Sequence, residues 1–91
     1  MIVVWSAQAI DNLINQLTYI RQENPSAAAR MALEIDRQAA LLGPFPGIGR
    51  LGRIPGTREI AIDRTPYIAI YRIRSATVEI LRLLHGAQRF P

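Results

Sequence analysis

One histidine and a set of arginines are the residues with the clearest chemical potential. His85 is the only histidine among 91 residues, and all eleven basic residues are arginine. Cleavage of RNA through its 2′-hydroxyl needs a base, an acid and cations that stabilise the charge on phosphorus. His85, Arg72 and Arg82 are the candidates for these catalytic roles. A structural role for His85 is the alternative, because an imidazole at the end of a strand can hydrogen-bond to backbone groups and cap that strand.

Other catalytic and metal chemistries lack the residues that they need. A metal site needs three or four ligands, whereas the chain has no cysteine, one histidine and seven scattered carboxylates. His85 has no obvious serine partner for a nucleophilic triad. Glu59, Asp63 and Glu79 are typical of solvated strand positions rather than of a catalytic carboxylate pair. The sequence therefore predicts neither a metal ion nor a cofactor.

A glycine-rich segment runs from Gly43 to Gly56 (GPFPGIGRLGRIPG). A phosphate-binding loop requires Gly-Lys-Ser/Thr before a helix, whereas an apolar run typical of a strand follows here. We interpret the segment as an irregular connection, neither helix nor strand, that carries Arg50 and Arg53 outward.

The chain is strongly basic, with a formal net charge of +4 and an isoelectric point of about 10.7. A GC-rich genome explains an all-arginine composition without any functional cause. Planar guanidinium groups also bind carboxylates and phosphates in a bidentate manner, which favours an anionic partner such as nucleic acid or an acidic protein segment. Composition leaves both explanations open.

A short strand and two helices are expected before the glycine-rich segment. The run 1–5 is rich in β-branched residues and Ser6 is a suitable N-cap. Helical spacing continues from Ala7 to near Glu23, and Asn24-Pro25 then starts a second helix that reaches about Leu42. The stripes expected to be buried are Ile10, Leu13, Ile14, Leu17 and Ile20 in the first helix, and Ala28, Met31, Ala32, Ile35, Ala39 and Leu42 in the second.

Three strands joined by tight turns are expected after the glycine-rich segment. The first is half-buried around Ile60 and Ile62, and the runs Tyr67 to Ile73 and Val78 to Leu84 are apolar on both faces. Arg72 and Arg74 share one face of their strand. Arg82 and Leu84 are expected to share a face with Ile80.

These elements predict one domain over residues 1–91 with an α+β fold in the order β-α-α-β-β-β. An αα-hairpin packs on one face of an antiparallel sheet, and the place of the first strand in the sheet is open. The other face is more apolar than an ordinary monomer leaves exposed, which favours a partner. No signal peptide or membrane span is recognised, and the lack of cysteine favours the cytoplasm.

Several short segments recur together in one known family. They are Val4-Trp5-Ser6 with Asp11 and Leu13, Tyr19-Ile20, Asn24-Pro25, Pro44-Phe45-Pro46-Gly47, Gly49-Arg50, Gly56-Thr57-Arg58-Glu59, Pro66-Tyr67-Ile68, Tyr71-Arg72 and Ile80-Leu81-Arg82-Leu83-Leu84-His85-Gly86-Ala87. Their order and spacing resemble the RelE/ParE superfamily, the toxins of type II toxin–antitoxin systems, over nearly the whole chain.

The resemblance implies one of two activities. RelE-like members cleave mRNA on the ribosome with an arginine on the middle strand and, in some members, a glutamate, a histidine and a final tyrosine. The arginine position matches Ile68, the glutamate position falls near Gly52, and the chain ends without that tyrosine. Only the histidine is retained, as His85. An isoleucine cannot stabilise a phosphorane, and the loss of such groups lowers rates by orders of magnitude.

ParE-like members lack that catalytic set and poison DNA gyrase, which blocks replication. The segments Gly-Thr-Arg-Glu and Leu-His-Gly-Ala resemble this branch. We therefore expect a gyrase inhibitor that arrests growth and stabilises plasmids by binding rather than by covalent chemistry. The alternative is a ribosome-dependent mRNA endoribonuclease that uses His85, Arg72 and Arg82.

Both branches imply a cognate antitoxin, acidic and partly disordered, that is encoded next door and folds on the toxin. The helical hairpin and the uncovered face of the sheet are the expected docking surfaces. DNA gyrase is the expected target, the ribosome with mRNA is the alternative, and no membrane is involved. The residues expected to bind target or antitoxin are Arg50, Arg53, Arg58, Arg72, Arg74, Arg82, His85, Arg89 and Phe90.

Overall fold

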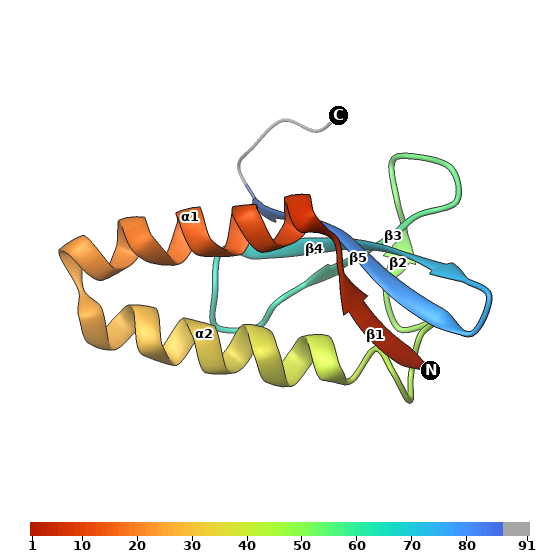
Figure 1. Ribbon diagram of the computed structural model, residues 1–91, viewed down its shortest axis with the longest axis horizontal. Coiled ribbons are helices and arrows are strands. Elements are labelled where there is room, and N and C mark those ends of the chain that lie inside the picture. Colours follow the sequence, from red (N-terminus) through yellow and green to blue (C-terminus); the bar gives the residue numbers. More distant parts are fainter. Residues whose placement is uncertain (87–91) are drawn as a thin grey trace.

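Two helices cover one face of a five-stranded sheet (Figure 1). The computed structural model describes residues 1–86, so Arg89 and Phe90 lie outside the described residues. The elements are β1 (Ile2–Trp5), α1 (Ala7–Glu23), α2 (Pro25–Ala40), β2 (Arg50–Leu51), β3 (Arg58–Ala61), β4 (Tyr67–Arg74) and β5 (Thr77–His85). The predicted α+β fold is confirmed. None of the helices formed by the described residues is long and apolar enough to cross a membrane.

The strand order β1-β5-β4-β3-β2 makes the sheet mixed. The predicted antiparallel meander is present as β3, β4 and β5, and β1 joins its edge parallel to β5. A parallel neighbour is possible because the whole chain between β1 and β5 serves as the crossover. β2 adds a strand that the sequence did not predict, where Arg50 is paired with Glu59. Two residues are too few to show the alternation that identifies a strand.

Polar side chains fix the ends of both helices. The Ser6 hydroxyl accepts a hydrogen bond from the Ala9 N–H (3.0 Å) and donates one to the Leu81 carbonyl (3.0 Å), which ties the start of α1 to β5. Asn24 ends α1 by donating its N–H to Ile20 (2.7 Å) and begins α2 by accepting from the Ala27 N–H (3.1 Å). α1 ends where predicted, and α2 ends two residues before the predicted Leu42.

The core lies between the helices and the sheet. Ile35 of α2 and Leu17 of α1 are buried there with Tyr71 and Ile80 of the sheet. The buried stripe of α1 is narrower than predicted, since Ile10 is 42% exposed and Ile14 is 55% exposed. α1 lies over β5 and beside α2, which leaves Ile10 and Ile14 partly open to solvent.

An irregularity in β5 changes which side chains share a face. Ile80 is paired with Tyr71, but Arg82 rather than Leu81 is paired with Ile70. One extra residue in a strand is a β-bulge, which re-aims the side chains after it. The backbone positions of Arg82 and Leu84 therefore lie on the face opposite to that of Ile80, which faces the core, although the Arg82 guanidinium reaches Asn12 of α1. The expectation that these three residues share a face was wrong.

Candidate functional site

Arg50 and Arg53 both donate hydrogen bonds to the carboxylate of Glu59. Glu59 was predicted to be solvated, but it is buried with 3% exposure, because the segment from β2 to β3 folds over it. Its carboxylate accepts hydrogen bonds from the Arg53 N–H (3.0 Å), from the Arg53 guanidinium (3.2 Å) and from Arg50 (3.2 Å). These bonds, with Arg53 the strongest influence, lower the pKa of Glu59 from 4.5 to about 2. Both arginines therefore help to hold the segment in place.

Arg58 also holds a loop. Its guanidinium donates hydrogen bonds to the carbonyls of Gly49 (2.8 Å) and Gly47 (3.4 Å). The buried Tyr71 hydroxyl holds the same loop, since it accepts from the Gly49 N–H and donates to the Pro46 carbonyl, both at 2.8 Å. The glycine-rich segment predicted to be irregular is therefore firmly anchored.

The remaining arginines of the sheet gather around a hollow on the face opposite the helices, which we name the arginine hollow. Its volume is about 460 Å³, and its lining comprises Ile54, Pro55, Gly56, Thr57, Ile70, Arg72, Ile73, Arg74, Leu81 and Arg82. Arg72 is paired with Glu79 (2.7 Å). Arg82 donates to the Asn12 side chain of α1 (3.1 Å), a contact between residues 70 positions apart that no local pattern indicates.

His85 lies on the other face of the sheet. It is paired with Tyr67, and their rings meet edge to face with centroids 6.2 Å apart. Tyr67 belongs to the core beneath the helices, whereas Ile70, the partner of Arg82, lines the arginine hollow. Residues paired across antiparallel strands share a face. The three candidates for RNA cleavage are therefore divided, with Arg72 and Arg82 on one face and His85 on the other.

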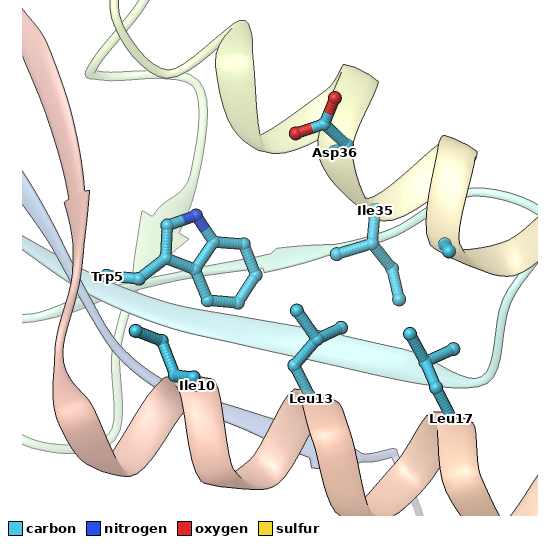
Figure 2. A pocket seen from close by; sticks show the side chains of 7 residues that line it. Trp5, Ile10, Leu13, Leu17, Ile35 and Asp36 are labelled. Atoms are coloured by element: carbon cyan, nitrogen blue, oxygen red, sulfur yellow. The ribbon is translucent and has the colours of Figure 1, made fainter.

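A second depression, the apolar groove, lies between the helices beside β1. It has a volume of about 280 Å³ and is lined by Trp5, Ile10, Leu13, Leu17, Ala32, Ile35 and Asp36. Figure 2 shows the Trp5 ring and the α1 side chains pointing into a common space, with Ile35 and Asp36 contributed by α2. The hairpin was predicted as a docking surface, but Trp5 was not singled out, because a residue in a short strand gives no sign of bordering a groove.

Comparison with known proteins identifies the family. Residues 3–90 match the model for the ParE toxin of the type II toxin–antitoxin system parDE. The chain belongs to the ParE toxin family. It is thus a toxin of a type II toxin–antitoxin system, as the motifs suggested.

Individual relatives agree with this family. The chain is 40% identical to "Putative toxin Y4kP" of Sinorhizobium fredii over an alignment of 87 residues. This alignment covers 96% of this chain and 90% of that protein. It is 36% identical over 86 residues to "Toxin RelE2" of Caulobacter vibrioides, which covers 94% of this chain and 96% of that protein. A solved structure of the chromosomal ParDE system from P. aeruginosa superposes with a TM-score of 0.87 at 25% identity, covering 93% and 95% of the two chains.

The positions expected to match the arginine and the glutamate of RelE-like members are Ile68 and Gly52, and neither carries a charged side chain. Ile68 is paired with Leu84 on the hollow's face of the sheet and is half-buried. Gly52 lies in the segment that covers Glu59, where its N–H donates to the Thr57 carbonyl (2.8 Å). Within residues 1–86, no three His, Asp or Glu side chains are grouped to hold a metal ion.

Proposed function

We propose that this ParE-family toxin inhibits DNA gyrase by binding and is neutralised by an antitoxin seated in the apolar groove. The observation that supports a binding mechanism is the division of His85 from Arg72 by the sheet. General acid–base catalysis needs its groups within hydrogen-bond reach of one substrate. A toxin that traps another enzyme has no such requirement.

A supercoiling assay tests the gyrase proposal. Purified toxin, added to gyrase, relaxed plasmid and ATP, is expected to reduce supercoiling or to accumulate cleaved plasmid. A type I topoisomerase assayed with the same toxin is the control and should keep its activity. Unchanged supercoiling at micromolar toxin would exclude gyrase as the target.

The apolar groove has the features of an antitoxin site. Trp5, Leu13 and Ile35 make its lining largely apolar, and Ile10 leaves 42% of its surface open to solvent at the rim. An amphipathic segment that folds on a partner binds by placing apolar side chains in such a groove. The solved ParDE neighbour is a toxin–antitoxin system, which supports an antitoxin as the occupant.

Two matched variants test this surface. Ile10→Asp places a charge at the groove, whereas Leu33→Asp places the same charge on α2 at a residue that is 72% exposed and does not line the groove. Each variant is co-expressed with the protein of the neighbouring reading frame. Ile10→Asp should lose co-purification and Leu33→Asp should keep it. Equal capture by both variants would place the antitoxin elsewhere.

Ribosome-dependent mRNA cleavage is the second candidate, and the 36% identity to "Toxin RelE2" favours it. In this case His85 acts with residues of its own face or with a group from the ribosome. Induction of the toxin would then produce cut transcripts, and His85→Ala would remove the cuts. Intact transcripts after induction of the unmodified chain would eliminate this candidate.

A further inference from the structure

The loop that follows α2 presents large apolar side chains to solvent. Residues 43–49, which we name the Phe45 loop, include Phe45, which is 57% exposed, and Ile48, which is 50% exposed. Leu51, which follows the loop in β2, is 79% exposed. Single exposed apolar side chains are common on proteins, whereas several large ones in one short segment indicate a contact site.

The Phe45 loop lies at the end of the molecule where β1 begins (Figure 1). The Met1 nitrogen donates a hydrogen bond to the Gly43 carbonyl (2.9 Å) at the start of the loop. Met1 and Ile2 are themselves exposed, so apolar surface continues from the loop to the start of β1. None of the described residues that line the apolar groove or the arginine hollow belongs to the loop. The loop is therefore a surface of its own.

The backbone of the loop is fixed, which keeps Phe45 from folding inward. Pro44 and Pro46 restrict the backbone on both sides of Phe45. The buried Tyr71 hydroxyl donates to the Pro46 carbonyl and accepts from the Gly49 N–H, both at 2.8 Å. A surface that is ordered before binding loses less conformational entropy when a partner binds.

The surroundings of the loop are basic. The sequence between Asp36 and Glu59 contains four arginines and no aspartate or glutamate. Arg58 donates to two backbone carbonyls of the loop (2.8 and 3.4 Å), and these neutral groups do not cancel its charge. The single Glu59 carboxylate is shared by Arg50 and Arg53, which leaves this group with an excess of positive charge. The complementary surface of a partner is therefore acidic.

These features favour a folded protein as the partner. Aromatic residues and arginine are enriched in protein–protein interfaces, whereas aspartate and glutamate are depleted. Nucleic acid bases stack on aromatic side chains, but Ile48 and Leu51 beside Phe45 are aliphatic. A disordered segment folds into a groove, whereas half or more of the Phe45 and Ile48 side chains is exposed. Such side chains are suited to enter a depression on a folded partner.

We propose that the Phe45 loop is the surface through which the toxin contacts gyrase, with Phe45 and Ile48 in an apolar depression of gyrase that is bordered by carboxylates near Arg58. The proposal rests on the proposed function, because it takes gyrase to be the target. The toxin then uses different residues for its target and for the antitoxin in the apolar groove.

A supercoiling assay on the full chain tests the loop. The F45S/I48S variant removes one aromatic and one aliphatic side chain from the loop. The Y19S/L33S variant is the matched control, because Tyr19 and Leu33 are exposed on the helices and lie outside the loop. The toxin concentration that halves supercoiling should rise at least about tenfold in F45S/I48S, since a few apolar anchors supply most of the binding energy of an interface. It should stay within about twofold in Y19S/L33S.

Three results would overturn the proposal. One is the same half-inhibitory concentration for F45S/I48S and the unmodified chain. Another is loss of antitoxin capture in F45S/I48S, which would make the loop part of the antitoxin site. The third is binding of the toxin to DNA without gyrase that is lost in F45S/I48S, which would make the loop a nucleic-acid site.

Thermal unfolding verifies that each variant folds. If F45S/I48S does not fold, Leu51→Ser carries the test, because its 79% exposed side chain contributes little to the core. Leu51→Ser should then inhibit supercoiling more weakly than Y19S/L33S does, and equal inhibition by these two variants would reject the loop.

Failure of the loop and failure of the proposed function give different results. Supercoiling that is unchanged by the unmodified chain would reject gyrase, and growth arrest after induction of the toxin alone then decides the loop. Arrest that is lost in F45S/I48S but kept in Y19S/L33S would retain the loop as the contact surface for another target. Arrest that is equal in both variants, or absent with the unmodified chain, would reject the loop.

Discussion

At the scale of single residues, the buried Glu59 carboxylate distinguishes arginines that hold the fold from arginines that line the hollow. Glu59 binds Arg50 and Arg53 and fixes the segment that forms a wall of the arginine hollow. Arg74 and Arg82 stay on the rim of that hollow. A count of arginines in the sequence cannot separate these groups, because the burial of Glu59 arises only when distant segments fold together.

Replacement of Glu59 by glutamine should lower the free energy of unfolding at pH 7 by about 1–3 kcal/mol, since charge-assisted bonds to two arginines are weakened. The pKa of Glu59 is about 2 in the folded chain and near 4.5 in the unfolded chain. The stabilisation is therefore complete above pH 4.5 and is lost as the pH falls towards 2. Denaturant unfolding at pH 7 and pH 3 should show the two proteins converging at the lower pH.

Glu34 is the internal control for that comparison. Its pKa is also lowered to about 2, chiefly by hydrogen bonds from Arg64, and it is present in both proteins. Its contribution to the pH dependence is therefore the same in each curve. A stability gap that is constant between pH 7 and pH 3 would contradict the assignment to Glu59.

The Tyr71 hydroxyl is the second residue whose role can be isolated. Tyr71→Phe removes a hydroxyl that donates to the Pro46 carbonyl and accepts from the Gly49 N–H. Tyr71 is fully buried. Buried groups left without partners cost free energy, so thermal unfolding should show a loss of about 2 kcal/mol. Tyr19→Phe, at an exposed position on α1, is the matched control and should change stability by less than about 0.5 kcal/mol. Equal effects would show that the loop anchor contributes nothing.

At the scale of elements, the helices were predictable and the details of the sheet were not. Ser6 and Asn24 are local signals, because each side chain caps a helix that starts beside it in the sequence. β2 and the bulge in β5 depend instead on partners far along the chain. The face of Arg82 was therefore assigned wrongly from strict alternation, although its strand was identified.

Asn24 caps two helices, so its replacement tests the hairpin as a unit. Asn24→Ala removes the acceptor of the Ala27 N–H at the start of α2 and should cost about 1 kcal/mol in the free energy of unfolding. Asn15→Ala, at an exposed position inside α1, has no cap to lose and should change stability by less than about 0.5 kcal/mol. A loss in Asn15→Ala that equals the loss in Asn24→Ala would show that the cap is not the cause.

At the scale of the whole molecule, the sheet separates features that lie close together in the sequence. Arg82 and His85 are three positions apart, yet the arginine hollow and the His85 ring lie on opposite faces. The motifs identified the family correctly, and the assignment of the RelE-like arginine position to Ile68 stays a prediction. The pairing of β4 with β5 shows in addition that His85 lies on the face of the sheet opposite the arginine hollow.

This separation predicts that one substitution does not restore RNA cleavage. Ile68→Arg returns an arginine to the position matched to the RelE-like branch, on the same face as Ile70 and the arginine hollow. His85 remains on the helix-covered face, so the base and the cation still do not meet. A ribosome-dependent cleavage assay, with a RelE toxin as positive control and thermal unfolding to verify the fold, should give intact transcripts. Cleavage by Ile68→Arg that disappears in Ile68→Arg/His85→Ala would mean that the two faces act on one substrate.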